Sequence, residues 1–233
     1  MTSTRSIVIL GALEQELAAF HRRTTNGKWR GVDVHFALTG VGKVAAAATT
    51  QRVISEHRPA AVLFTGVAGS LDPARKIGHI GIGVAAIDAD FDVRAWMPGH
   101  ARGQLPFGGG RLWASDPALV RLALEAPVPG LFPAYIATGS AFLDHPAKAA
   151  FLRNVLPDLE AEVGGGLRRP DLIEMEGSAV LQVSAANRVP ALAIRAVSDG
   201  VEGDAVADFN AFVDQAVEVY AGVVEHVLDH ARF

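Results

Sequence analysis

Short apolar runs alternate along the chain with alanine-rich stretches that have helical character. We expect strands over residues 6–10, 32–38, 60–64, 81–87, 135–137 and 191–197, and helices over residues 13–22, 43–57, 176–187 and 208–228. The run at 191–197 is almost continuously apolar, which is typical of a strand buried on both faces. Strands that alternate with helices in this way indicate the α/β class.

Two stretches rich in glycine and proline interrupt this pattern, at residues 97–110 and 163–170. We expect both to be surface loops. Neither changes the composition enough to mark a domain boundary, so residues 1–233 are expected to form one domain. A domain of this size buries roughly 70% of the surface of its unfolded chain and needs no cross-links.

The composition excludes several classes of protein. The chain has no cysteine, which removes disulfides and thiolate zinc sites. Its net charge is −4 and it has no long basic run, so we expect no nucleic-acid partner. No apolar run reaches the ~18 residues that span a bilayer, and the first ten residues have the pattern of a strand, not of a signal peptide. We therefore expect a soluble, cytoplasmic protein with no membrane partner.

One glycine-rich turn has the spacing of a dinucleotide-binding site. Residues 40–45 (GVGKVA) follow a strand and open a helix. However, the next strand ends in Phe64-Thr65-Gly66, where an acidic residue would hold the ribose. A phosphate-binding P-loop also fails, because Ala37 and Val44 stand where glycine and serine or threonine are needed. We interpret the turn as a tight connection and expect no cofactor.

The sequence offers neither a serine-hydrolase motif nor a convincing metal site. The G-x-S-x-G motif is absent, and His226 and His230 form the only histidine pair at helical spacing. That pair lacks a third ligand nearby, so we interpret it as a solvated helix face and expect no metal.

Three acidic residues stand next to predicted apolar elements. Glu16 follows the first strand, Glu176 precedes an apolar helix, and Asp199 ends the most apolar strand. Taken singly, the two glutamates fit a first helical turn and Asp199 fits a turn before Gly200. Ligands of open α/β sheets bind at the carboxyl ends of strands, where Glu16 and Asp199 are able to meet. Acids that converge on one cleft are a known route to separate acid and base roles.

Seven short motifs cover almost the whole chain in a fixed order. They are residues 9–16 (ILGALEQE), 39–45 (TGVGKVA), 65–69 (TGVAG), 103–106 (GQLP), 138–142 (TGSAF), 174–176 (EME) and 195–199 (RAVSD). In this order they resemble the methylthioadenosine/S-adenosylhomocysteine nucleosidases of the nucleoside phosphorylase/hydrolase family. The resemblance implies a three-layer α/β sandwich with a mixed central sheet. It also implies hydrolysis of the N-glycosidic bond of an adenine nucleoside by a homodimer.

The same resemblance implies the roles of the acidic residues. Asp199 would protonate purine N7 as general acid, which requires burial to keep it protonated, and Ser198 would orient it. Glu16 would activate the water, and Glu176 would accept hydrogen bonds from the ribose 2′- and 3′-hydroxyls. Arg195 would order the acids.

Further residues are assigned to the substrate by resemblance alone. Phe142 and the backbone of Leu143 would hold the base, and Met175 would pack against the ribose. The remaining contacts in this assignment come from Val67, Ala68 and Gly69, with Trp96 and Pro106 of the partner chain closing the 5′ pocket. The chain departs from the family pattern at Val67, where a serine is common, at Ser140, where an aspartate is usual, and in a longer stretch at 160–172. These departures leave the 5′ substituent open.

Alternative functions remain. A phosphorylase of the same fold would use phosphate in place of water, and a noncatalytic protein would only bind a nucleoside. The resemblance implies arginines in the phosphorylases on the loops that correspond to residues 11–16 and 65–69, and here neither loop has a basic residue. Lys43 is the nearest candidate cation. An oxidoreductase that uses a dinucleotide is disfavoured by the missing ribose-binding acid.

Overall fold

A mixed β-sheet forms the centre of the molecule. The computed structural model describes residues 6–24 and 27–232. In this part of the chain, nine strands form one sheet in the order β10-β7-β5-β11-β4-β1-β3-β2, with β6 paired to β5. In chain order the strands are β1 (Ser6–Gly11), β2 (Lys28–Trp29), β3 (Val32–Leu38), β4 (Ala61–Ser70), β5 (Ile80–Asp88), β6 (Trp113–Ala114), β7 (Leu131–Thr138), β10 (Leu172–Glu174) and β11 (Ala191–Asp199).

The strand directions bring several strand ends together. Strands β3, β1, β4 and β11 are parallel, and β5 runs antiparallel to β11. Strand β10 pairs with β7 and also with the last residues of β4, so β4, β11, β5, β7 and β10 close into a ring. The carboxyl ends of β1, β4 and β11 therefore lie at one edge, next to β10.

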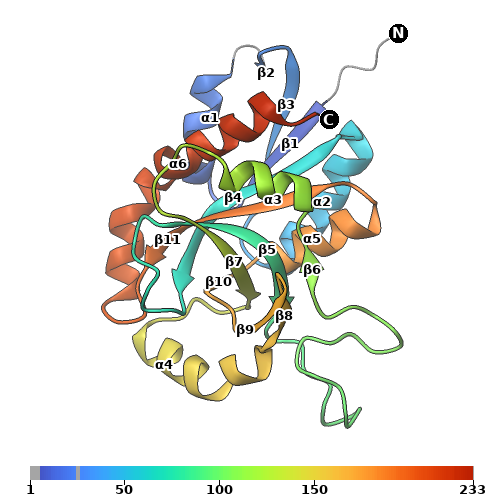
Figure 1. Ribbon diagram of the computed structural model, residues 1–233, viewed down its shortest axis with the longest axis vertical. Helices are drawn as coiled ribbons and strands as arrows, with labels where there is room; N and C mark the ends of the chain where they lie inside the picture. Colours follow the sequence, from blue (N-terminus) through green and yellow to red (C-terminus); the bar gives the residue numbers. More distant parts are fainter. Residues whose placement is uncertain (1–5, 25–26, 233) are drawn as a thin grey trace.

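Helices cover both faces of the sheet, as Figure 1 shows. Helices α2 (Lys43–His57) and α5 (Gly177–Ala186) pack together on one face, and α6 (Ala205–His230), α3 (Pro117–Leu124) and α1 (Ala18–Arg23) pack on the other. Alternate residues of a strand supply the two cores, because Ile7 and Ile9 belong to the α6 side and Val8 and Leu10 to the α2 side. Helix α4 (His145–Asn154) follows β7. The expected three-layer α/β sandwich with a mixed sheet is confirmed.

Two expected boundaries are wrong. The helix expected at 13–22 is a 3₁₀ turn, η1 (Glu14–Glu16), followed by α1, because the Glu16 side chain folds back onto the N–H groups of Ala12 and Leu13. The strand expected to end at Thr65-Gly66 continues to Ser70. Gly66 is not a turn residue here: a Cβ at this position would lie 2.6 Å from the Glu16 carboxylate.

Other elements were not expected from the sequence. The stretch at 163–170, expected to be a surface loop, forms most of a hairpin of β8 (Ala161–Val163) and β9 (Gly166–Arg168), with a glycine turn between the strands. It follows the 3₁₀ turn η2 (Leu156–Leu159). The helices α3 and α4 and the short strands β2, β6 and β10 were also missed, whereas residues 97–110 form the expected loop. Within the described ranges, no helix combines the length and apolar character needed to cross a bilayer.

Candidate active site

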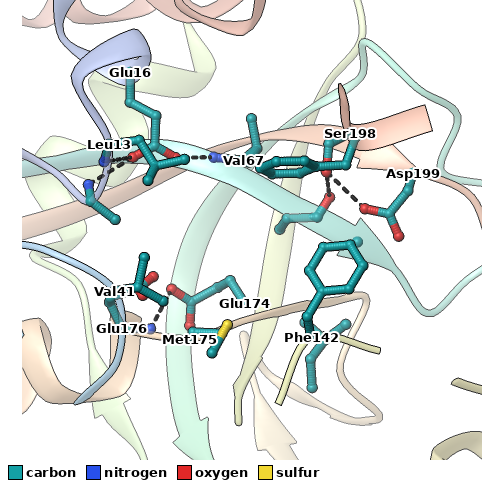
Figure 2. A pocket seen from close by; sticks show the side chains of 15 residues that line it. Leu13, Glu16, Val41, Val67, Phe142, Glu174, Met175, Glu176, Ser198 and Asp199 are labelled. Carbon is teal, nitrogen blue, oxygen red and sulfur yellow. Dashed lines mark hydrogen bonds between the residues drawn. The ribbon is translucent and has the colours of Figure 1, made fainter. Parts of the chain in front are cut away.

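The carboxyl ends of β1, β4 and β11 open into a pocket of about 420 Å³. This volume suits a small-molecule ligand, because such sites typically occupy roughly 300–1,000 Å³. The pocket brings together nine residues that the sequence analysis assigned to the site, namely Glu16, Val67, Ala68, Gly69, Phe142, Met175, Glu176, Ser198 and Asp199. Figure 2 shows Glu16 and Asp199 on opposite sides of it, with Glu176 and Met175 below Glu16.

Glu16 is held rigidly at one side of the pocket. Its carboxylate accepts hydrogen bonds from the N–H groups of Ala12 at 2.7 Å, Leu13 at 3.0 Å and Val67 at 3.1 Å. Burial raises the pKa of Glu16 above its ordinary value, although the Arg195 guanidinium and these hydrogen bonds oppose the shift. Behind it, the Tyr220 hydroxyl donates to the Glu16 carbonyl at 2.8 Å. The result is a fixed carboxylate whose basicity is increased by its surroundings.

Two further carboxylates, those of Glu174 and Glu176, lie just before α5. Glu174 accepts hydrogen bonds from the Thr138 hydroxyl at 2.6 Å and from the Gly177 N–H at 2.7 Å, and it pairs with Arg195 at 2.9 Å. Glu176 accepts a hydrogen bond from the Gly42 N–H at 2.7 Å. Burial raises the pKa of Glu176 to about 7, and the neighbouring Glu174 charge adds to the effect.

The glycine-rich turn before α2 thus has a defined use. The N-terminus of a helix attracts an anion, and here the Gly42 N–H binds the carboxylate of Glu176, an anion of the protein itself. This contact replaces the pyrophosphate that such a turn holds in a dinucleotide-binding protein.

Arg195 is not among the residues that line the pocket. It is 1% exposed, and its guanidinium stacks 3.7 Å from the centre of the Phe64 ring while it pairs with Glu174. The arginine partly neutralises the group of buried carboxylates. The ordering role expected for it stays a prediction.

Asp199 lies on the other side of the pocket and is 3% exposed. The Ser198 hydroxyl donates to its Oδ1 atom at 2.8 Å. Its Oδ2 atom forms an ion pair with Lys148 of α4, a residue that is only 1% exposed. Lys148 was not expected from the sequence, because nothing in the first turn of α4 distinguishes it from a solvent-exposed residue.

Aromatic and apolar side chains line the space beside Asp199. Phe142 and Phe209 meet edge to face with ring centres 5.7 Å apart, and Phe209 was not among the expected residues. Leu143 lines a narrow extension of the pocket together with Lys148. A flat, apolar heterocycle that also has polar edges suits this end of the pocket.

The two residues expected to act on a partner chain do not line the pocket. Trp96 is 65% exposed and meets Phe107 edge to face, with ring centres 5.9 Å apart. Pro106 lies in the same loop. Their assignment to a neighbouring subunit stays a prediction.

The fold and this pocket define a class of α/β protein in which buried acidic side chains line a small-molecule pocket at the carboxyl ends of the strands. A family model described as the phosphorylase superfamily matches residues 6–229, and the chain belongs to this family.

Individual proteins similar to this chain share one description. The chain is 31% identical over 228 residues to a 5′-methylthioadenosine/S-adenosylhomocysteine nucleosidase of Anoxybacillus flavithermus, with 91% of this chain and 92% of the relative covered. It is 32% identical over 237 residues to the enzyme of the same description from Geobacillus thermodenitrificans, with 94% of each covered. Among solved structures, the Neisseria meningitidis nucleosidase in complex with methylthio-immucillin-A has a TM-score of 0.84 at 28% identity and covers 97% of this chain and 100% of that one.

Proposed function

We propose that the protein is a purine nucleosidase that hydrolyses the N-glycosidic bond of an adenine nucleoside such as 5′-methylthioadenosine or S-adenosylhomocysteine. The observation that carries this proposal is the placement of Glu16 and Asp199 on opposite sides of one pocket. Glu176 lines the same pocket and accepts a hydrogen bond from Gly42 in the glycine-rich turn. The nucleosidases among its relatives support the same reaction.

In the proposed reaction, the bond between C1′ and the purine nitrogen breaks and its electron pair leaves with the base. Asp199 passes a proton to purine N7, which neutralises the departing base. Glu16 takes a proton from a water molecule while the oxygen of that water attacks C1′. The Glu176 carboxylate accepts hydrogen bonds from the ribose hydroxyls and stabilises the positive charge that develops on the sugar. The products are the free base and the free sugar.

The electrostatics of the pocket favour water over phosphate. Among the residues that the structure describes, no lysine or arginine lines the main pocket, whereas Glu16, Glu174, Glu176 and Asp199 all line it. Lys43 pairs with Asp88 at 2.7 Å and Asp90 at 3.0 Å, so its charge is already compensated. Phosphate sites need arginine, lysine or a set of free N–H groups, and carboxylates repel a dianion.

The proposal includes a homodimer whose partner chain closes the 5′ end of the pocket with Trp96 and Pro106. The exposed pair of Trp96 and Phe107 supports this part, since Phe107 is 82% exposed and large apolar side chains of this kind mark interaction surfaces. The soluble nucleoside would be the only other partner.

A single assay tests the reaction. Purified protein is incubated with 5′-methylthioadenosine in phosphate-free buffer, and adenine and the sugar are separated by chromatography. We expect free adenine and free methylthioribose at a rate that added phosphate does not increase. A sugar 1-phosphate, or a rate that depends on phosphate, would identify a phosphorylase. Tight binding without release of adenine would identify a noncatalytic binding protein.

A further inference from the structure

A lysine is buried beside Asp199, at the end of the pocket where the purine would bind. Lys148 lies in the first turn of α4, which Asp144 caps by accepting the Ala147 N–H at 3.0 Å. The helix would form equally well with an apolar residue at position 148, since helix propensities of straight-chain residues differ little. Burying an ammonium group costs several kcal/mol unless it is paired. The lysine therefore points to a use other than packing.

The ammonium group of this lysine makes polar contacts next to Asp199. Its Nζ atom pairs with Oδ2 of Asp199 and donates to the Gly200 carbonyl at 2.7 Å. Gly69 leaves room for the pair, because a Cβ there would lie 2.7 Å from Asp199 Oδ2 and 3.2 Å from Lys148 Nζ. Lys148 and Asp199 both line the narrow extension of the pocket beside Phe142.

This arrangement bears on the source of the proton that the leaving purine requires. Both oxygens of Asp199 accept hydrogen bonds, one from Ser198 and one from Lys148, which is the pattern of an ionised carboxylate. An ionised carboxylate has no proton of its own to donate. The ammonium group beside it has three.

We infer that Lys148 is a positioning residue that acts through Asp199, holding the carboxylate at the base end and supplying the proton that Asp199 passes to the purine. The inference rests on the proposed nucleosidase reaction. An Nζ–H bond breaks as an O–H bond forms on Asp199, and that O–H bond breaks as N7 gains the proton. The electron pair of the glycosidic bond goes to the base, water adds to C1′, and its proton goes to Glu16. Lys148 is left neutral and Glu16 protonated, and exchange with water returns both to their starting states.

The test compares Lys148→Gln, Asp199→Asn and the double variant with the unaltered protein. Glutamine keeps a hydrogen-bond donor at position 148 but has no proton to lose. Single-turnover and steady-state release of adenine from 5′-methylthioadenosine gives kcat and KM, and thermal unfolding monitors the fold. Lys76→Gln, which alters an exposed lysine outside the pocket, is the matched control and should behave as the unaltered protein.

We expect Lys148→Gln to lower kcat at least tenfold, part of the ~10²–10⁴-fold that general acid catalysis contributes, with KM changed by less than about threefold. Because the two groups act as a unit, the double variant should be within about threefold of Asp199→Asn alone. A kcat for Lys148→Gln close to that of the unaltered protein would overturn the inference. So would losses that multiply in the double variant, since independent effects mark a purely structural lysine. If Lys148→Gln does not fold, Lys148→Met is measured by the same criteria, and failure of both to fold shows a structural lysine and also overturns the inference. Absence of adenine release by the unaltered protein refutes the proposed function itself and is thereby distinguished from these results.

Discussion

Replacing Glu176 by glutamine should stabilise the protein at neutral and alkaline pH. Surroundings that disfavour its charge raise the pKa of Glu176 from 4.5 to about 7, and the residue is only 6% exposed. At about 1.4 kcal/mol per pKa unit, the ionised form costs the folded state about 3 kcal/mol. Between pH 4.5 and 7 the unfolded chain releases this proton before the folded protein does, so the free energy of unfolding falls as pH rises. Above that range the penalty is constant.

The assay is urea or thermal unfolding of Glu176→Gln and the unaltered protein at several pH values from 4.5 to 8. Relative to the unaltered protein, the free energy of unfolding of the variant should rise by about 3 kcal/mol from the lowest to the highest pH, equivalent to roughly 6–12 °C in Tm for a chain of this size. Glu162→Gln, at an exposed position on β8, is the control and should show no such trend. A stability difference between Glu176→Gln and the unaltered protein that does not change with pH would refute the reasoning.

The same variant should lose activity while it gains stability. An amide stabilises positive charge on the ribose less well than a carboxylate, so kcat should fall more than KM rises, and the loss should be smaller on a 2′-deoxynucleoside. Equal losses on both substrates would contradict the contact with the ribose hydroxyls.

Further variants test the other parts of the site. Asp199→Asn should stay folded and lose at least ~10²-fold in kcat for adenine release, and near-normal turnover would exclude it as the proton donor. Arg195→Met should lower the free energy of unfolding by about 3–5 kcal/mol, because it leaves Glu174 buried without its partner. Adding Glu174→Gln should restore part of that loss in chemical denaturation, and a double variant no more stable than Arg195→Met would contradict the pairing. Trp96→Ser together with Phe107→Ser should convert the proposed dimer to a monomer in analytical ultracentrifugation and raise KM; an unchanged sedimentation coefficient would place the interface elsewhere.

The sequence was most informative where apolar runs were long. Strands β1, β5 and β11 and the helix at Lys43–His57 were predicted within two residues at each end. A strand buried on both faces has a continuous apolar run, which makes it easy to recognise. The two short helices α3 and α4 were missed although each begins with an aspartate cap and a proline in the first turn, at Asp116-Pro117 and Asp144-His145-Pro146.

The candidate site was predicted only in part, for a physical reason. Glu16 and Asp199 are at strand ends, and the rule for open α/β sheets brings such residues together. Lys148 and Phe209 reach the pocket from helices, and their positions depend on how α4 and α6 pack, which no local pattern reports. Gly66 was misread as a turn because its small size serves a neighbouring carboxylate and not its own backbone.

The central position of β11 has a consequence for how the protein is made. This strand lies between β4 and β5, yet it comes near the end of the chain and carries both Arg195 and Asp199. During synthesis, the residues that will become β4 and β5 leave the ribosome more than a hundred positions before their shared neighbour. Until β11 arrives, each presents an unpaired edge, the kind of surface that promotes aggregation. Completion of the proposed site and protection of these edges therefore occur together, when β11 is inserted.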